Sequence, residues 1–233
     1  MRTILLRASG IVLACCVCLL TMAWTHAALE ESGWISLSDG ESLEGWRISE
    51  DSGHGDTQAW TVEDGAIVGT QDRPGNGGFI YSEATFGDFM LELELHPDWG
   101  LDSGLFLRST PGGQCYQVMV DAYDGGSVGG IYGEGTGGFY QSDPEWTEHY
   151  RKDDWNRLLV LCVGNPPRID VWLNGWHMTE FVPSEENHPE LAPKLPREGH
   201  IGLQVHAGER YDGLHTRFRN IRIRPLECEE ADD

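Results

Sequence analysis

The chain has 233 residues, enough for one large all-β domain or two small domains. Its 38 acidic and 16 basic residues give a formal net charge of -22 at pH 7. Such a charge repels nucleic acid and anionic lipid, so binding to a phosphate backbone is excluded as a main role. The charge suits a secreted protein that acts on neutral or cationic ligands, and solubility alone also explains it.

The N-terminus has the pattern of a signal peptide. Two arginines precede an apolar run over residues 11–23, and small residues follow at the cleavage positions. The run is too short to favour a stable membrane span. We therefore expect a signal peptide over residues 1–27, a linker over 28–33, and a protein that is secreted or periplasmic after cleavage. A lipid anchor at Cys15, which ends a lipobox-like sequence, is the minor alternative.

Short β-prone segments separated by turn residues follow along the chain. Residues 59–69 contain an Asp-Gly dipeptide, and residues 168–182 contain an Asn-Gly dipeptide. Both dipeptides favour the tight turn of a β-hairpin, so each segment predicts two antiparallel strands. Residues 200–206 and 216–225 also alternate between apolar and polar side chains, which is typical of strands.

The segment over residues 91–121 reads as three consecutive strands. Their polar residues recur at every second position, which places them on one face of a sheet. We expect this face to be either a solvated surface or a binding face. The residues that alternation places on this face are Glu92, Glu94, His96, Arg108, Gln117, Met119 and Asp121, all polar except Met119.

About a dozen short strands, with no convincing helical period outside the signal peptide, predict an all-β fold: a two-sheet antiparallel sandwich or jelly roll over residues 34–226. The acidic tail over 227–233 is expected to be disordered. Residues 125–138 hold eight glycines, and we leave open whether they form a loop beside a site or a plain connector. Cys115 and Cys162 lie in strand-like runs and are expected to be buried as small apolar residues.

Five motifs in order resemble the 3-keto-disaccharide hydrolase domain family. They are the Ser-Leu-Ser-Asp-Gly and Leu-Glu-Gly-Trp pair at 36–46, Gly-Asp-Phe at 87–89, Asp-Ser-Gly-Leu-Phe-Leu-Arg at 102–108, Val-Trp-Leu-Asn-Gly at 171–175, and Gly-His-Ile-Gly-Leu-Gln at 199–204. The resemblance implies a concanavalin A-like jelly roll and carbohydrate as the ligand.

The resemblance also implies an activity, namely cleavage of glycosides that carry a ketone at sugar C3. The ketone makes the C2 proton acidic, so that a base removes it, the C1 leaving group departs, and water adds back. Gln117 stands where the family often has a glutamate, and an amide cannot replace a catalytic acid or a metal ligand. Asp102 stands where the family usually has an asparagine.

The candidate site residues follow from the chemistry that this reaction needs. The catalytic candidates are His206 as base or acid, Glu94 for proton transfer, and Arg108 as a fork-shaped donor to an enolate. The candidates for substrate binding are Gln117, Asp121, Gln204, Trp99 and Tyr132. A divalent cation such as Ca²⁺ is a further option for polarising the ketone, with no ligands assigned to it. The alternative is that the charged residues form ordinary cross-strand ion pairs.

Two main hypotheses stay open at this point. The first is an exported carbohydrate-active enzyme, a hydrolase or lyase on 3-keto-glycosides. The second is a non-catalytic, lectin-like carbohydrate-binding module, which the replacement at Gln117 favours. An interaction domain in a surface assembly is a weaker third. The sugar, its linkage and the oligomeric state cannot be read from the sequence.

Overall fold

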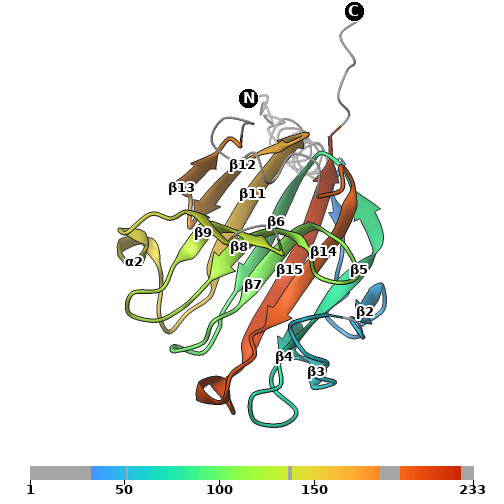
Figure 1. Ribbon diagram of the computed structural model, residues 1–233, viewed down its shortest axis with the longest axis vertical. Coiled ribbons are helices and arrows are strands. Elements are labelled where there is room, and N and C mark those ends of the chain that lie inside the picture. The colour runs from blue at the N-terminus through green and yellow to red at the C-terminus, as the bar shows by residue number, and fades with distance from the viewer. Residues whose placement is uncertain (1–32, 51, 136–137, 184–194, 227–233) are drawn as a thin grey trace, which may run out of the picture. The chain divides into compact units, whose positions relative to one another are not determined.

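The strands of the chain form two antiparallel sheets that lie face to face (Figure 1). The computed structural model describes residues 33–50, 52–135, 138–183 and 195–226. The chain divides into two compact units, Met1–Trp34 and Ile35–Asp233, and every assigned strand lies in the second. The predicted signal peptide and acidic tail fall outside the described residues and stay predictions. Within the described ranges, no helix is long and apolar enough to cross a membrane.

The first sheet has eight strands in the order β13-β12-β11-β6-β15-β4-β3, with β1 paired to β15. Every pair in it is antiparallel. Its strands are β1 (Ile35–Ser36), β3 (Trp60–Glu63), β4 (Ala66–Gly69), β6 (Phe89–Leu95), β11 (Asn156–Gly164), β12 (Pro167–Leu173), β13 (Trp176–Phe181) and β15 (Thr216–Pro225).

The second sheet has seven strands in the order β10-β9-β8-β7-β14-β5-β2, also antiparallel throughout. Its strands are β2 (Trp46–Ile48), β5 (Gly78–Phe86), β7 (Gly104–Ser109), β8 (Cys115–Val120), β9 (Val128–Glu134), β10 (Gly138–Gln141) and β14 (Gly199–Val205). Two short helices complete the described residues: α2 (Trp146–His149) and the 3-10 helix η1 (Glu209–Tyr211).

The hydrophobic core lies between the two sheets, because alternate residues of each strand point inward. The inward residues are almost completely buried, and together they form one apolar cluster. Their burial supplies the main stabilising free energy of the sandwich. Representative members from both sheets are Leu91, Leu93, Leu95, Leu105, Val118 and Leu203. The predicted two-sheet jelly-roll sandwich is therefore confirmed.

Both predicted hairpins are confirmed, and their turns show why the dipeptides matter. Asp64 and Gly65 have φ of 50° and 79°, and they join β3 to β4. Asn174 and Gly175 have φ of 51° and 88°, and they join β12 to β13. Two successive residues with positive φ are the requirement of a type I′ turn. Asp, Asn and Gly tolerate this conformation better than other residues.

The prediction that residues 91–121 form neighbouring strands of one sheet is wrong. β6 belongs to the eight-stranded sheet, whereas β7 and β8 belong to the seven-stranded sheet. The connection between β6 and β7 crosses from one sheet to the other. The polar side chains of β6 and β8 consequently point away from the core on opposite sides of the sandwich.

Candidate functional site

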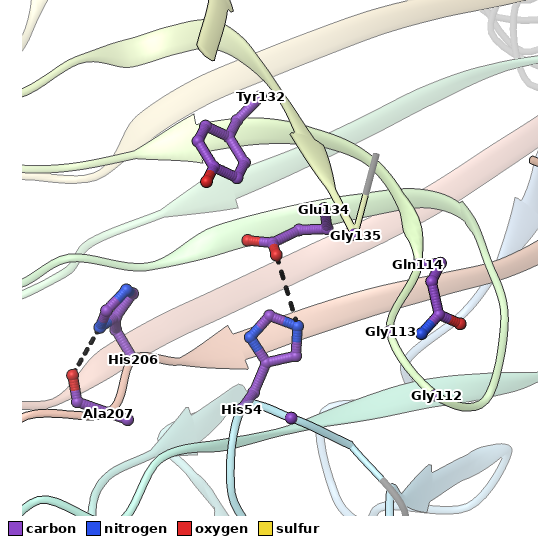
Figure 2. A pocket seen from close by; sticks show the side chains of 10 residues that line it. His54, Gly112, Gly113, Gln114, Tyr132, Glu134, Gly135, His206 and Ala207 are labelled. Carbon is purple, nitrogen blue, oxygen red and sulfur yellow. Dashed lines mark hydrogen bonds and ion pairs between the residues drawn. The ribbon is translucent and has the colours of Figure 1, made fainter. Parts of the chain in front are cut away.

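A polar cavity lies on the outer face of the seven-stranded sheet (Figure 2). Its volume is about 390 Å³, within the roughly 300–1,000 Å³ of small-molecule sites. Four glycines in its wall expose backbone to the cavity. The larger side chains that line it are His54, Gln114, Tyr132, Glu134 and His206. They come from the segment between β2 and β3, the turn before β8, strand β9 and the end of β14.

An aromatic floor supports His54 in this position. The imidazole lies over Phe79 and Phe106, with ring centroids 5.9 and 5.3 Å apart, and both phenylalanines are fully buried. Gly113 has φ of +90°, and a Cβ there would lie 2.9 Å from Cδ2 of His54. A glycine is therefore needed where the backbone passes the imidazole ring.

Two side-chain amides in series determine which ring nitrogen of His54 carries the proton. Nε2 of Gln117 donates to Oε1 of Gln204 at 3.4 Å, and Nε2 of Gln204 donates to Nδ1 of His54 at 3.1 Å. Because Nδ1 accepts, the imidazole proton lies on Nε2, which faces Oε2 of Glu134 at 3.7 Å. Burial lowers the pKa of His54, and the nearby charge of His206 lowers it further, so the ring is neutral at pH 7.

Glu134 has the properties of an acid that works near neutral pH. Its carboxyl group projects from β9 into the cavity, as Figure 2 shows. Burial raises its pKa to about 7, with a further contribution from the negative charge of Asp102. A carboxyl group with this pKa holds a proton on a substantial fraction of molecules at pH 7 and can donate it. Glu134 therefore suits proton transfer to or from a bound ligand.

His206 presents one ring nitrogen as a base. Its Nδ1 lies 2.6 Å from the carbonyl oxygen of Ala207, and since a carbonyl can only accept, Nδ1 carries the proton. The neutral ring then has its lone pair on Nε2, which lies 3.8 Å from Oδ1 of Asp102. The side chain is 40% exposed, so a ligand in the cavity can reach it.

Five of the residues predicted from the sequence lie on this outer face. His206 and Tyr132 line the cavity, and the phenol oxygen of Tyr132 points toward the space between Glu134 and His206 (Figure 2). Gln117 and Gln204 lie behind His54 and are almost fully buried. Asp121 is buried just after β8, where the charge of Asp102 contributes to its raised pKa.

Glu94 does not lie in this site, and its predicted place beside His206 is corrected. Its Oε2 accepts from Nε of Arg219 and from Nδ2 of Asn220, both at 2.7 Å, on the outer face of the eight-stranded sheet. It sits there because β6 lies in the other sheet. Glu94 thus forms an ordinary cross-strand ion pair, which was the alternative drawn from the sequence, but its partner is Arg219 and not Arg108.

Arg108 also lies elsewhere, buried inside the sandwich with a side chain only 1% exposed. Its guanidinium donates to the carbonyl oxygens of Gly87 and Gly164 and to Oδ1 of Asp88, each at 2.7 Å. The reason is a bulge: Arg108 has φ of 51°, and the pairing register of β7 with β14 shifts at this point. One extra residue reverses the strict alternation, so the side chain turns inward.

Trp99 is not part of the cavity lining. Its ring stacks on Trp146 at 6.1 Å and contacts Tyr150 at 6.3 Å, while the ammonium of Lys152 lies 4.2 Å above it. These contacts use the aromatic faces that would stack on a sugar. The structure thus gives Trp99 a packing role.

The divalent cation stays a prediction without a site. Across the part of the chain that the structure describes, no group of three or more His, Cys, Asp or Glu side chains is arranged to hold a metal ion. The carboxyl groups near the cavity instead face histidines and one another.

Three lining side chains were missed from the sequence, namely His54, Gln114 and Glu134. Glu134 lies two positions after Tyr132 in β9, which is the side-chain period of a strand. Glycines occupy several of the neighbouring positions, so no alternation of apolar and polar residues was visible in the sequence. The glycine-rich segment is thus largely a strand beside the site. His54 lies outside the assigned strands, in a segment with no periodic pattern. It reaches the cavity only because the chain between β2 and β3 crosses the sheet face.

Residues 33–224 match the family model of the 3-keto-alpha-glucoside-1,2-lyase-like domain. The chain belongs to this family. A 3-keto-disaccharide hydrolase from Bacteroides thetaiotaomicron is 24% identical over an alignment of 247 positions, and the match covers 85% of this chain and 80% of the relative. Membership in the 3-keto-alpha-glucoside-1,2-lyase-like family confirms the resemblance seen in the sequence and the expectation of an enzyme of the glycoside hydrolase type.

Solved structures of other proteins have the same fold. A Parabacteroides distasonis protein described as a glycosyl hydrolase superposes with a TM-score of 0.57 at 20% identity, covering 85% of this chain and 96% of that one. A Bacillus subtilis protein with a galectin-like fold superposes with a TM-score of 0.55 at 14% identity, covering 82% and 94%. These likenesses support the lectin-like sandwich that the family resemblance implied.

Proposed function

We propose that this protein is an exported enzyme that cleaves 3-keto-glycosides by proton abstraction at sugar C2, elimination of the C1 substituent and hydration. The observation that carries the proposal is the pairing, around one polar cavity, of a base and an acid. Nε2 of His206 has a free lone pair, and Glu134 has a pKa of about 7. General acid–base catalysis needs such a pair near the operating pH.

The first step removes the acidic proton. Nε2 of His206 takes the C2 proton, and the electron pair of the C–H bond moves toward C3, where the ketone oxygen becomes an enolate. The neutral imidazole of His54 and the phenol of Tyr132 supply N–H and O–H donors at the cavity. Such donors stabilise the negative charge that develops on oxygen in the transition state.

The second and third steps expel the leaving group and add water. The bond from C1 to the leaving oxygen breaks, a double bond forms between C1 and C2, and Glu134 gives its proton to the leaving oxygen. Water then adds to C1, Glu134 recovers a proton from it, and His206 returns a proton to C2. The sum is hydrolysis of the glycosidic bond, with both side chains restored. Glu134 takes the role that the sequence had suggested for Glu94.

The test uses the purified full-length protein and a 3-keto-disaccharide in D₂O. We expect release of a 3-keto-monosaccharide that carries deuterium at C2, because the C2 proton exchanges while it is on His206. Product without deuterium at C2 would contradict the elimination route. A parallel assay with a chelator shows whether turnover needs a divalent cation.

A lectin-like binding module is the second candidate, and one observation favours it. Gln117 stands where a glutamate is common in the family, and it forms part of the amide chain behind His54. A polar cavity over an aromatic floor also suits a sugar that is bound without reaction. Saturable glycan binding, with no product from any 3-keto-glycoside, would establish this function in place of the first.

Export rests on the N-terminal sequence pattern. Cell fractionation followed by N-terminal sequencing tests it: a mature chain that starts at residue 28 supports a cleaved signal peptide. A lipid-modified N-terminus at Cys15 would support the anchored alternative, and recovery of the intact chain from the cytoplasm would contradict both.

A further inference from the structure

A pair of carboxyl groups lies directly behind His206. Asp102 precedes β7, and Asp121 follows β8. The side chain of Asp121 is almost fully buried, and the nearby carboxyl group of Asp102 raises its pKa through its charge and through hydrogen bonding. Two carboxylates offer only acceptors, so a hydrogen bond between them requires that the pair holds one proton. The other oxygen of Asp121, Oδ1, has no partner among the described residues.

Asp102 also contacts the cavity residues. Its Oδ1 lies 3.8 Å from Nε2 of His206, and its Oδ2 accepts from the hydroxyl of Tyr211 at 3.1 Å. Its charge is one of the two causes of the raised pKa of Glu134. The charged and titratable groups that face the pair from the neighbouring elements are Arg210 and Tyr211 of η1, Tyr123, Glu134 of β9 and His206.

The proton of the pair stays in place at neutral pH. Burial raises the pKa of Asp121 to about 9, and the charge and hydrogen bond of Asp102 add to this effect. The guanidinium of Arg210 opposes it only in part. Because Asp121 is uncharged at pH 7, the pair carries a single negative charge.

We infer that the Asp102–Asp121 pair is a positioning device for His206, in which Asp121 lends its proton to a hydrogen bond that keeps one negative charge on Asp102 opposite Nε2. This inference rests on the proposed function, since it assumes that His206 is the base. When Nε2 takes the substrate's C2 proton, Asp102 stabilises the imidazolium across the 3.8 Å gap. The proton of Asp121 is not transferred in the reaction.

The Asp102–Asp121 pair should stop supporting His206 at high pH. Loss of the Asp121 proton brings two carboxylates into contact, and their repulsion turns Asp102 away from His206. Glu134, as the acid, loses its proton first, since its pKa is about 7. Log(kcat/KM) should therefore fall with a slope of about -1 above the pKa of Glu134 and about -2 above that of Asp121.

The decisive variant is Asp121→Asn in the full-length protein. An amide has the same shape and donates permanently to Asp102, so the variant removes the titration of Asp121 without removing a donor to Asp102. Above pH 9 the slope of log(kcat/KM) should be about -1 instead of -2, because one titrating group is gone. Asp102→Asn should lower kcat about tenfold to a hundredfold with little change in KM, because the lost charge acts mainly on the transition state.

A second readout does not depend on turnover. In protein with ¹³C-labelled aspartate, the carboxyl signal that disappears in Asp121→Asn should titrate far above the ordinary range of aspartate. In Asp102→Asn the pKa of Asp121 should fall, because the neighbouring charge is removed. Asp98→Asn is the matched control: Asp98 also pairs with a histidine, His215, at 3.3 Å, but does not line the cavity. It should leave the slopes unchanged.

The outcomes separate the two proposals. Turnover by the wild type, with the same slope of about -2 in Asp121→Asn, would overturn the inference alone. An Asp121 signal that titrates below pH 5 would do the same. Absence of turnover in the wild type would overturn the proposed function and, with it, the role of the pair at His206.

Discussion

Glu94 and Glu134 are both glutamates on the outer face of an antiparallel sheet, and they differ in what surrounds them. Glu94 lies between a guanidinium and an amide, each 2.7 Å away. Among the described residues, Glu134 has no cation as close: it faces a neutral imidazole at 3.7 Å and the negative charge of Asp102 raises its pKa. The first arrangement forms an ion pair, whereas the second raises the pKa of Glu134 to about 7.

The same contrast holds for the two faces as a whole. On the eight-stranded sheet, Glu92 bonds to Arg157 and Arg222, as Glu94 does to Arg219. On the seven-stranded sheet, the carboxyl groups of Glu134 and Asp121 are shielded from water and have raised pKa values. Raised pKa values and a cavity together mark a functional site, whereas satisfied ion pairs mark a solvated surface.

The largest effect on activity is expected from Glu134→Gln. Loss of the acid should lower kcat/KM by roughly 10²- to 10⁴-fold, the range for one acid–base group. The decrease in the wild-type rate as pH rises through about 7 should also disappear, because it reports ionisation of this carboxyl group. Steady-state rates from pH 5 to 9, with circular dichroism as the folding control, test this. A variant that keeps half of the wild-type activity would remove Glu134 from the mechanism.

The largest effect on stability is expected from Arg108→Leu. It leaves Asp88, whose side chain is 5% exposed, without its buried cation, so the free energy of unfolding should fall by roughly 3–5 kcal/mol. Urea unfolding measures the change. The double variant Arg108→Leu, Asp88→Leu should recover part of the loss, because no buried charge remains. A KM that changes while the protein is still folded would contradict the assignment of Arg108 to the core.

An effect on stability that depends on pH is expected from Asp121→Asn. The pKa of Asp121 is raised from 3.8 to about 9 in the folded state, so its contribution to stability is fully present below pH 3.8 and is lost as pH rises through about 9. The wild type should lose up to about 1.4 kcal/mol per pH unit in this window. The variant lacks this loss and should be more stable than the wild type at pH 8. Melting temperatures at pH 5 and pH 8 test this, and parallel changes in both proteins would contradict it.

The smallest effect is expected from Glu94→Gln. A partly exposed ion pair contributes at most about 1 kcal/mol, and the residue lies outside the cavity, so kcat/KM should stay within about twofold of the wild type. The same assay as for Glu134→Gln makes the two glutamates directly comparable. A loss as large as that of Glu134→Gln would return Glu94 to the site.

Local patterns in the sequence predicted the elements well. Alternation of apolar and polar residues located β6, β8 and β14, because a strand with one buried face needs this period. The Asp-Gly and Asn-Gly dipeptides located two hairpins, since few other residues adopt successive positive φ values. The motifs led to the right family, and Gln117, Gln204 and His206, which alternation had grouped together, lie on one face of the seven-stranded sheet.

Alternation alone could not say which sheet a strand joins. Glu94 and Gln117 both alternate with core residues, yet they face opposite sides of the sandwich because the chain crosses between sheets after β6. Nor could it reveal the bulge at Arg108, where one residue with φ of 51° reverses the side-chain direction. Both errors came from extending a local rule across a break in pairing.

The sequence by itself determined the all-β class, the hairpins, the core alternation and the family, because these depend on residue type and near-neighbour spacing. Only the tertiary structure decided the composition of the site. It brought His54, Glu134 and His206 around one cavity from segments far apart in the chain, and it placed Asp102 against Asp121. Burial and neighbouring charge set the pKa of each group, and both arise only when distant segments are packed together.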